Sequence, residues 1–169
     1  RGGVNGTLFV VPTPLGDPAD LSLRAREVLG SVDRVAAEDT RTALRLFREI
    51  GVTPPKLVSC HDHNEPERAA ELVGRMLGGE RIALISDAGT PLISDPGYRV
   101  LTEAIAAGIE IVVLPGPCAA VAALSGAGLP SDRFLFLGFL PRDPGPRAAA
   151  LRERRFEPAT VIVYEAPHR

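Results

Sequence analysis

The chain has 169 residues, of which 45% are hydrophobic and 24% charged, a balance typical of a globular protein with one good core or two small ones. A net charge of -2 argues against a protein whose whole surface binds nucleic acid. No apolar run approaches the roughly 18 residues of a membrane-spanning helix, and residues 1–5 lack the apolar core of a signal peptide, so we expect a cytoplasmic protein without a membrane partner.

Short apolar runs alternate with helical patterns over the first 117 residues. This alternation predicts an α/β fold, a mostly parallel sheet with helices on both faces. The expected strands lie at residues 7–12, 34–37, 57–60, 82–85 and 111–114.

The helices between these strands carry local start and stop signals. We expect Asp20 to cap the first helix and Gly30 to end it. Leu44 is expected on the inward face of the second helix. In the fourth, Asp95 is the expected N-cap and Pro96 the first helical residue.

The chain after residue 117 predicts a second region. A helix of small residues at 118–127 and a linker at 128–131 precede two strands, at 134–139 and 160–164, and a helix near 146–155. We therefore expect an N-terminal domain at 1–117, a connecting helix and linker at 118–131, and the beginning of a second α/β domain at 132–169. Two strands and a helix are too few for an independent core, so this second domain is expected to be truncated at residue 169.

Charge is uneven along the chain. Residues 141–169 hold six arginines against four acidic residues, whereas acidic residues exceed basic ones in the first 140. A contact with a polyanion is therefore expected in the C-terminal part. The alternative is that these arginines form the solvated face of a helix.

Three of the expected strands run into loops rich in Gly and Pro that contain no Lys or Arg, at residues 8–17, 82–97 and 111–119. Ligands of parallel α/β sheets bind beyond the carboxyl ends of the strands, so the three loops predict one crevice. The usual phosphate-binding motifs, G-x-G-x-x-G and G-x-x-x-x-G-K-[ST], are absent. The pattern favours a ligand with a purine, a ribose and an amino-acid tail, held by main-chain groups and a carboxylate such as Asp87, with Gly89 and Gly116 allowing close approach.

Seven sequence blocks resemble one family, the ribosomal RNA small subunit methyltransferase I family of the tetrapyrrole methylase superfamily, or class III methyltransferases. They are PTPLG (12–16), AEDTR (37–41), HDHNE (61–65), SDAGTP (86–91), SDPG (94–97), PGP (115–117) and YEAPHR (164–169). The resemblance covers nearly the whole chain in order. It implies S-adenosyl-L-methionine bound between two α/β domains, a homodimer, and 2′-O-methylation of a cytidine in the decoding region of bacterial 16S ribosomal RNA, in the small ribosomal subunit.

The resemblance assigns cofactor contacts to the three loops and to the strand end of the second domain. The residues concerned are Pro12, Leu15, Asp87, Ala88, Gly89, Thr90, Pro115, Gly116, Pro117, Cys118, Ala119 and Tyr164. Asp17 stands where Asn is common in the family, and Cys118 stands where Ser is expected. Cys118 still offers its backbone N–H, so we expect cofactor binding to survive.

Methyl transfer to a ribose hydroxyl needs positioning and a general base. Candidates for the base are Glu38, Asp39, His61 and His63, and candidates for substrate contacts are Arg41, Asn64 and Glu65. Arg41 suits a phosphate or carboxylate clamp. Helix capping by Asp39 or Thr40 is an equally good reading of that block. The H-x-H pair lacks a third ligand, so no metal is expected.

The two cysteines, Cys60 and Cys118, have no CxxC spacing, which leaves neither a disulfide framework nor a zinc ligand set. Both are expected to be buried thiols.

Other functions remain open at this point. A tetrapyrrole-precursor or diphthamide-pathway methylase would share the cofactor crevice, and a non-catalytic nucleotide- or RNA-binding module would bind without transferring methyl. The AEDTR and HDHNE blocks favour the RNA enzyme.

Overall fold

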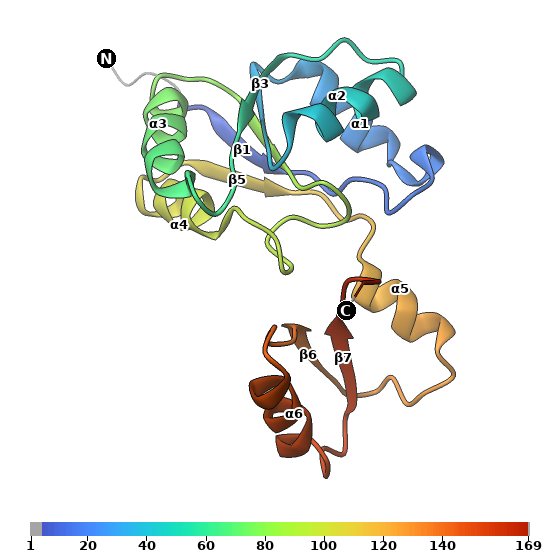
Figure 1. The fold of residues 1–169 in the computed structure, drawn as a ribbon. Coiled ribbons are helices and arrows are strands. Elements are labelled where there is room, and N and C mark those ends of the chain that lie inside the picture. The colour runs from blue at the N-terminus through green and yellow to red at the C-terminus, as the bar shows by residue number, and fades with distance from the viewer. Residues whose placement is uncertain (1–4, 169) are drawn as a thin grey trace. The chain divides into compact units, whose positions relative to one another are not determined.

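The computed structural model of the chain describes residues 5–168. The expectation that residues 1–5 do not form a signal peptide lies mostly outside the described residues. Arg169, the last position of the YEAPHR block, lies outside them as well. The chain divides into two compact units, residues 1–117 and 118–169 (Figure 1), and each is described by itself. The finer division, with 118–131 as a connecting segment, stays a prediction. No helix among the described residues is both long and apolar enough to cross a membrane.

The first unit contains a five-stranded sheet in which every pair of neighbouring strands is parallel, in the order β3-β2-β4-β1-β5. The strands are β1 (Thr7–Val10), β2 (Arg34–Ala37), β3 (Lys56–Ser59), β4 (Ile82–Ile85) and β5 (Glu110–Val113). The helices are η1 (Pro18–Asp20), α1 (Leu23–Ser31), α2 (Thr40–Glu49), α3 (Glu65–Leu77) and α4 (Tyr98–Ala106). The predicted α/β fold with a mostly parallel sheet is confirmed.

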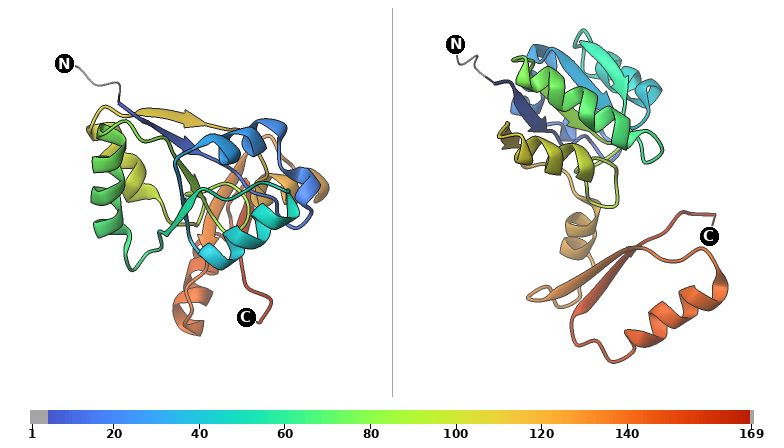
Figure 2. Two further views of the ribbon diagram at one scale, coloured as in Figure 1. Left: turned by 90° about the horizontal axis from the view of Figure 1, so that it is seen from above. Right: turned by 90° about the vertical axis from the view of Figure 1, so that its left-hand side faces the viewer.

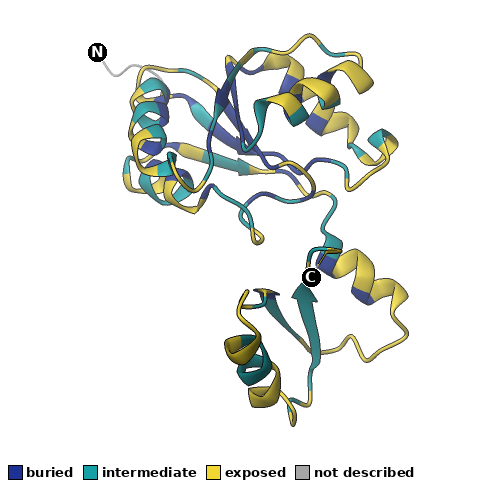
Figure 3. Ribbon diagram, viewed as in Figure 1, coloured by how far each residue is buried: buried dark blue, intermediate teal, exposed yellow. Residues whose placement is uncertain are grey.

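Helices cover both faces of this sheet. Figures 1 and 2 show α1 and α2 on one face and α3 and α4 on the other. Because successive strand residues point to opposite faces, β2 sends Val35 and Ala37 into the core under α1 and α2, and Ala36 into the core under α3 and α4. The inner strands β2 and β4 are accordingly buried at every position (Figure 3), whereas the edge strands β3 and β5 are mostly half-buried or exposed.

Three predictions about α1 and α2 were wrong. Ser22, not Asp20, caps α1, since its hydroxyl accepts a hydrogen bond from the Ala25 backbone N–H at 3.0 Å. Asp20 instead ends the short turn of η1, and the helix runs through Gly30 to Ser31. Leu44 is 37% exposed, because α2 turns Ala43 and Phe47, four residues apart, toward the sheet.

The predicted start of α4 was also wrong. The helix begins at Tyr98, its N-cap is Gly97 with φ +121°, and no side chain of its own caps it. Asp95 and Pro96 precede the helix in the loop. Its free amides bind the carboxylate of Glu65, which belongs to the start of α3.

The second unit contains α5 (Ala119–Gly126), α6 (Pro144–Glu153) and two parallel strands, β6 (Phe134–Phe139) and β7 (Thr160–Tyr164). The β6–β7 register shifts between Phe136 and Gly138. Its strands are mostly half-buried (Figure 3), in contrast to the inner strands β1, β2 and β4 of the first unit. This small unit therefore has little closed core of its own.

Candidate functional site

The loops after β1, β4 and β5 are joined at the carboxyl edge of the sheet. The backbone N–H of Thr13 donates to the Gly89 carbonyl at 2.9 Å, and the Gly89 N–H donates to the Thr13 carbonyl at 3.0 Å. The Thr90 hydroxyl donates to the Pro117 carbonyl at 2.7 Å. Three segments distant in sequence are thereby fixed to one another.

Two glycines permit this close approach. A Cβ on Gly116 would lie 2.5 Å from the Pro12 Cβ, and one on Gly89 would lie 3.1 Å from the Leu15 Cδ2. Gly89 also has φ +82°, which side chains other than glycine rarely adopt. In the structure, the missing side chains make room for the neighbouring loop.

Asp39 caps α2 and also links its loop to the Asp87 loop. Its carboxylate accepts from the Arg41 backbone N–H at 2.8 Å and from the Arg41 guanidinium at 3.1 and 2.7 Å. The hydrogen bonds from Arg41, side chain first, lower the pKa of Asp39 to about 2. The Asp39 backbone N–H donates to Asp87 Oδ1 at 3.1 Å. Asp39 is thus a poor proton acceptor at neutral pH, and the capping reading of this block is correct.

The pKa of Glu38, the residue before Asp39, is shifted in the opposite direction. Burial, and then the charges of Asp87 and Asp95, raise its pKa above the ordinary 4.5. Burial also raises the pKa values of Asp87 and Asp95. Glu38 therefore holds a proton more readily than an ordinary glutamate. Within residues 5–168, no group of three or more His, Cys, Asp or Glu side chains is arranged to hold a metal ion.

The HDHNE block makes a turn held together by its own polar groups. Asn64 Oδ1 accepts from the His61 backbone N–H at 2.9 Å, and Asn64 Nδ2 donates to the Ser59 carbonyl at 3.2 Å. The rings of His61 and His63 meet edge to face with centroids 6.0 Å apart. His61 Nδ1 is buried without a hydrogen-bond partner among the described residues.

Glu65 Oε1 accepts backbone N–H groups of Gly97 at 3.1 Å, Arg99 at 2.7 Å and Val100 at 3.4 Å. This predicted substrate residue therefore closes the start of α4 and ties α3 to the end of the Asp87 loop.

The predicted cofactor residues fall into two groups. Those from Pro12 to Pro117 belong to the first unit, and Cys118, Ala119 and Tyr164 belong to the second. In the second unit the Tyr164 hydroxyl accepts from the Ala120 N–H at 3.1 Å, and its ring meets Phe136 and Phe139 edge to face. Tyr164 thus anchors the start of α5, one residue after Ala119.

The prediction of two buried thiols holds for one cysteine. Cys60 is buried, and burial raises its pKa to about 11, so it stays protonated and unreactive. Cys118 is half-buried, because it lies at the N-cap of α5.

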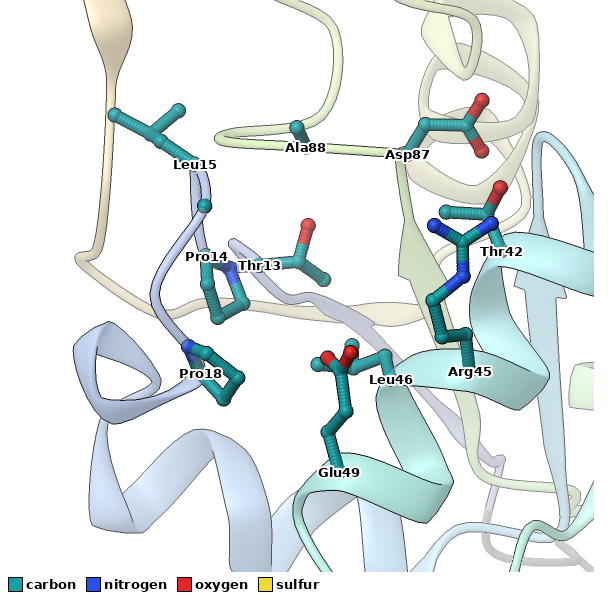
Figure 4. Close-up of a pocket in the computed structure, with 11 residues that line it drawn as sticks. Thr13, Pro14, Leu15, Pro18, Thr42, Arg45, Leu46, Glu49, Asp87 and Ala88 are labelled. Carbon is teal, nitrogen blue, oxygen red and sulfur yellow. The ribbon is translucent and has the colours of Figure 1, made fainter.

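A cavity of about 190 Å³ lies between the first loop and α2 (Figure 4). Leu15, Asp87 and Ala88 line it and are also predicted cofactor residues, while Thr42, Arg45 and Glu49 reach it from α2. These three α2 residues were not among the predicted site residues, because charged and polar residues on a helix usually form a solvated face. The available signal was an acidic residue at the end of a helix, where the helix dipole disfavours it.

Comparison with known proteins places this arrangement in a family. Tetrapyrrole (corrin/porphyrin) methylases match residues 7–169. Over 97% of its length the chain is 56% identical to the ribosomal RNA small subunit methyltransferase I of Pseudomonas aeruginosa and 52% identical to that of Escherichia coli O157:H7. It covers 58% and 57% of those two proteins, so it spans little more than half the length of the curated relatives it matches. The resemblance seen in the sequence blocks is confirmed.

Solved structures agree on the fold. A uroporphyrin-III-C-methyltransferase from Thermus thermophilus superposes with a TM-score of 0.57 at 28% identity, over 81% of this chain and 64% of that chain. A diphthine synthase superposes with a TM-score of 0.69 over 96% of this chain and 66% of that chain, and its 19% identity supports the fold alone. On the match of residues 7–169, the chain belongs to the tetrapyrrole methylase family.

Proposed function

We propose that the protein uses S-adenosyl-L-methionine to methylate the ribose 2′-hydroxyl of a cytidine in the decoding region of 16S ribosomal RNA. The observation that carries the proposal is the joined carboxyl edge of the sheet, where three loops without a Lys or Arg meet beside Glu38 and Asp87. About 50% identity to enzymes named ribosomal RNA small subunit methyltransferase I supports the RNA substrate.

The residues at this edge fit the proposed cofactor. A sulfonium and an ammonium group carry positive charge, and this edge offers carboxylates and main-chain groups. Asp87 and Ala88 to Thr90, with residues 12–15 and 115–117, would hold the cofactor in the first unit, and Cys118, Ala119 and Tyr164 would contribute from the second. When bound, S-adenosyl-L-methionine supplies an electrophilic methyl group.

The chain's own groups have separate roles in this proposal. Glu38 accepts the proton of the ribose hydroxyl, because its raised pKa brings it nearer to the range of an effective general base. Asp39, held ionised by Arg41, fixes the loop that carries Glu38 and orients Asp87 through its backbone N–H. His61 and His63 remain alternative bases.

The RNA backbone is proposed to meet the arginines of the second unit. Arg142, Arg147, Arg152, Arg154 and Arg155 are concentrated in and around α6, and Arg41 adds an exposed guanidinium on the first unit. Phosphate contacts of this kind position a nucleic acid without reading its sequence. Action on small ribosomal subunits further implies a cytoplasmic protein, and we propose that it works as a homodimer.

A second candidate is methylation of a tetrapyrrole precursor. The similarity to a uroporphyrin-III-C-methyltransferase, at 28% identity, favours it. Such an enzyme would share the cofactor-binding edge but would transfer methyl to carbon. The two candidates therefore differ in the acceptor.

The test uses the protein at the length of its curated relatives. It is incubated with unmodified 30S subunits and labelled S-adenosyl-L-methionine, and the digested RNA is analysed for 2′-O-methylcytidine by mass spectrometry. Labelled 2′-O-methylcytidine supports the proposal. Labelled uroporphyrinogen with unlabelled RNA would support the second candidate, and RNA binding without label would indicate a non-catalytic module.

A further inference from the structure

The cavity beside α2 lies within the first unit and borders the proposed cofactor edge. Its walls come from the first loop, from α2, and from Asp87 and Ala88 after β4 (Figure 4). Its volume of about 190 Å³ is roughly six times the ~30 Å³ that one water molecule occupies in the liquid. A single flat heteroaromatic ring fits such a space.

Apolar and polar walls of the cavity are on different sides. Pro14, Leu15 and Pro18 provide apolar surface from the first loop. In Figure 4 the Arg45 side chain extends from α2 toward Thr42 and Asp87, and the Glu49 carboxylate points from the same helix into the cavity. The cavity therefore has apolar surface on one side. On the other side it has a hydrogen-bond donor, Arg45, and an acceptor, Glu49.

The charges exclude a phosphate as the occupant. Among the described residues, Arg45 is the single cation that lines the cavity, and Glu49 and Asp87 line it as well. Two carboxylates against one guanidinium repel a dianionic or monoanionic group. A neutral ring with a donor beside an acceptor matches the pair Glu49 and Arg45 instead.

Helix stability does not explain why Glu49 is there. Glu49 is the last residue of α2, where the partial negative charge of the helix end disfavours a carboxylate. Arg45 precedes it by four residues, the weaker of the two orders for a helical ion pair. Among the described residues, neither side chain takes part in an ion pair. A residue that breaks local preferences without a structural gain is a candidate for function.

We propose that this cavity receives the base of the nucleotide to be methylated, with Glu49 accepting from the exocyclic amino group of cytosine and Arg45 donating to its O2. The inference rests on the proposed function. Enzymes that modify a base within a duplex turn it out of the helix and read its Watson–Crick edge between apolar side chains, and the walls of this cavity would hold a base in the same way. The attached ribose then lies toward the Asp87 side of the cavity.

Glu49 and Arg45 should differ in how they distinguish cytosine from uracil. Glu49 faces an amino group in cytosine but a carbonyl oxygen in uracil, so it favours cytidine alone. Arg45 donates to an oxygen that both pyrimidines carry, so it supports binding of both. A merely structural role for either residue predicts no such difference.

The experiment compares kcat/KM on 30S subunits reconstituted with cytidine or uridine at the methylated position, using the protein at the length of its relatives. We expect the unchanged protein to prefer cytidine by about tenfold or more. Glu49→Ala should lower kcat/KM for cytidine about tenfold, leave uridine nearly unchanged and so abolish the preference. Arg45→Ala should lower both and keep the preference. Arg48→Ala, an exposed residue of the same helix outside the cavity, serves as the matched control and should change neither.

Folding and cofactor binding are measured in parallel. Thermal unfolding of Glu49→Ala should match or exceed that of the unchanged protein, and cofactor affinity measured by calorimetry should be the same in all four proteins. If the RNA is methylated and both Glu49→Ala and Arg45→Ala retain the unchanged kcat/KM and preference, the base-reading role is wrong while the proposed function stands. If the unchanged protein binds cofactor but methylates no RNA, the proposed function is wrong and the inference with it.

Discussion

The two ends of the parallel sheet differ in whether their charged side chains are paired. At the end where the strands begin, Arg34 is buried, with 6% of its side chain exposed. Its guanidinium donates to Glu80 at 3.1 and 3.3 Å. Arg75 donates to Glu80 as well as to Glu71, at 3.2 and 3.0 Å. The hydrogen bonds to Glu80, with those from Arg34 as the largest cause, lower the pKa of its carboxyl group.

At the end where the strands terminate, Glu38, Asp87 and Asp95 gather without an ion pair among the described residues. Burial is the first cause that raises each of their pKa values. Both ends belong to one rigid sheet, so the difference lies in which partners surround the carboxylates. Paired charges stabilise the fold at one end, while unpaired charges at the other are held in a state suited to binding a cation and moving a proton.

Glu38→Gln is the variant with the largest expected effect on the reactive end. It removes the proposed base, and we expect kcat for RNA methylation to fall by about 10²- to 10⁴-fold. Because the pKa of Glu38 is raised above 4.5, the base form is lost as pH falls through that raised value. The acid limb of kcat should therefore lie above pH 4.5 in the unchanged protein and be absent from the residual activity of the variant.

Stability provides the control for Glu38→Gln. A carboxylate whose folded pKa is raised destabilises the folded state at neutral pH, and this penalty disappears below the unfolded value. The variant should therefore unfold at the same or a higher temperature at neutral pH. A lower kcat accompanied by a lower unfolding temperature would contradict the separation of function from stability at this end.

Asp87→Arg tests the same end by cofactor binding. It replaces an acceptor with a cation and removes the partner of the Asp39 backbone N–H. We expect S-adenosyl-L-methionine binding, measured by calorimetry, to be lost. Asp87→Asn keeps an oxygen in place without the charge and should bind with intermediate affinity. Unchanged binding in Asp87→Arg would contradict the proposed cofactor site.

Glu80→Ala tests the stabilising end. It leaves the buried Arg34 guanidinium without its main partner, and we expect a loss of about 2 kcal/mol in the free energy of unfolding in urea, with cofactor binding unchanged. Glu103→Ala is the matched control, because its 3.2 Å pair with Arg99 on α4 is exposed and contributes about 0.3 kcal/mol. Equal losses in the two variants would show that burial of Arg34 does not matter.

Glu65→Ala has the smallest expected effect and tests a helix start at the end of the sheet where the strands terminate. It removes the carboxylate that caps α4, and a lost cap lowers stability by about 1 kcal/mol. Hydrogen exchange at the Arg99 and Val100 amides should speed up before the rest of α4 is affected. Glu65→Gln keeps an accepting oxygen and should protect both amides partly. Identical protection in all three proteins would show that the hydrogen bonds to Glu65 do not hold the helix start.

Much of the fold could be predicted from local patterns. The expected strands at 34–37, 82–85, 134–139 and 160–164 have the bounds of β2, β4, β6 and β7, because a short apolar run between polar turns determines a buried strand. Helix starts were less predictable. The cap of α4 comes from Glu65, more than thirty residues earlier in the chain, and no local signal reports it.

The candidate site also contains one part that could be predicted from the sequence and one part that could not. The loop blocks around Asp87 and Gly116 were recognised from their residues, since Gly, Pro and a carboxylate after a strand indicate a binding loop. The contribution of α2 to the cavity was missed, because charged residues on a helix usually form a solvated face. Only the packing of α2 beside the first loop makes those two side chains line a cavity.

By itself, the sequence determined the order of strands and helices, the three loops and the family, since each depends on residues that are neighbours in the chain. The tertiary structure decided which charges are paired. Arg34 and Glu80 form an ion pair at one end of the sheet, while Glu38 meets Asp87 and Asp95 at the other. The pKa of a carboxyl group depends on burial and on charges within a few ångströms, and those neighbours come from strands that are distant in sequence.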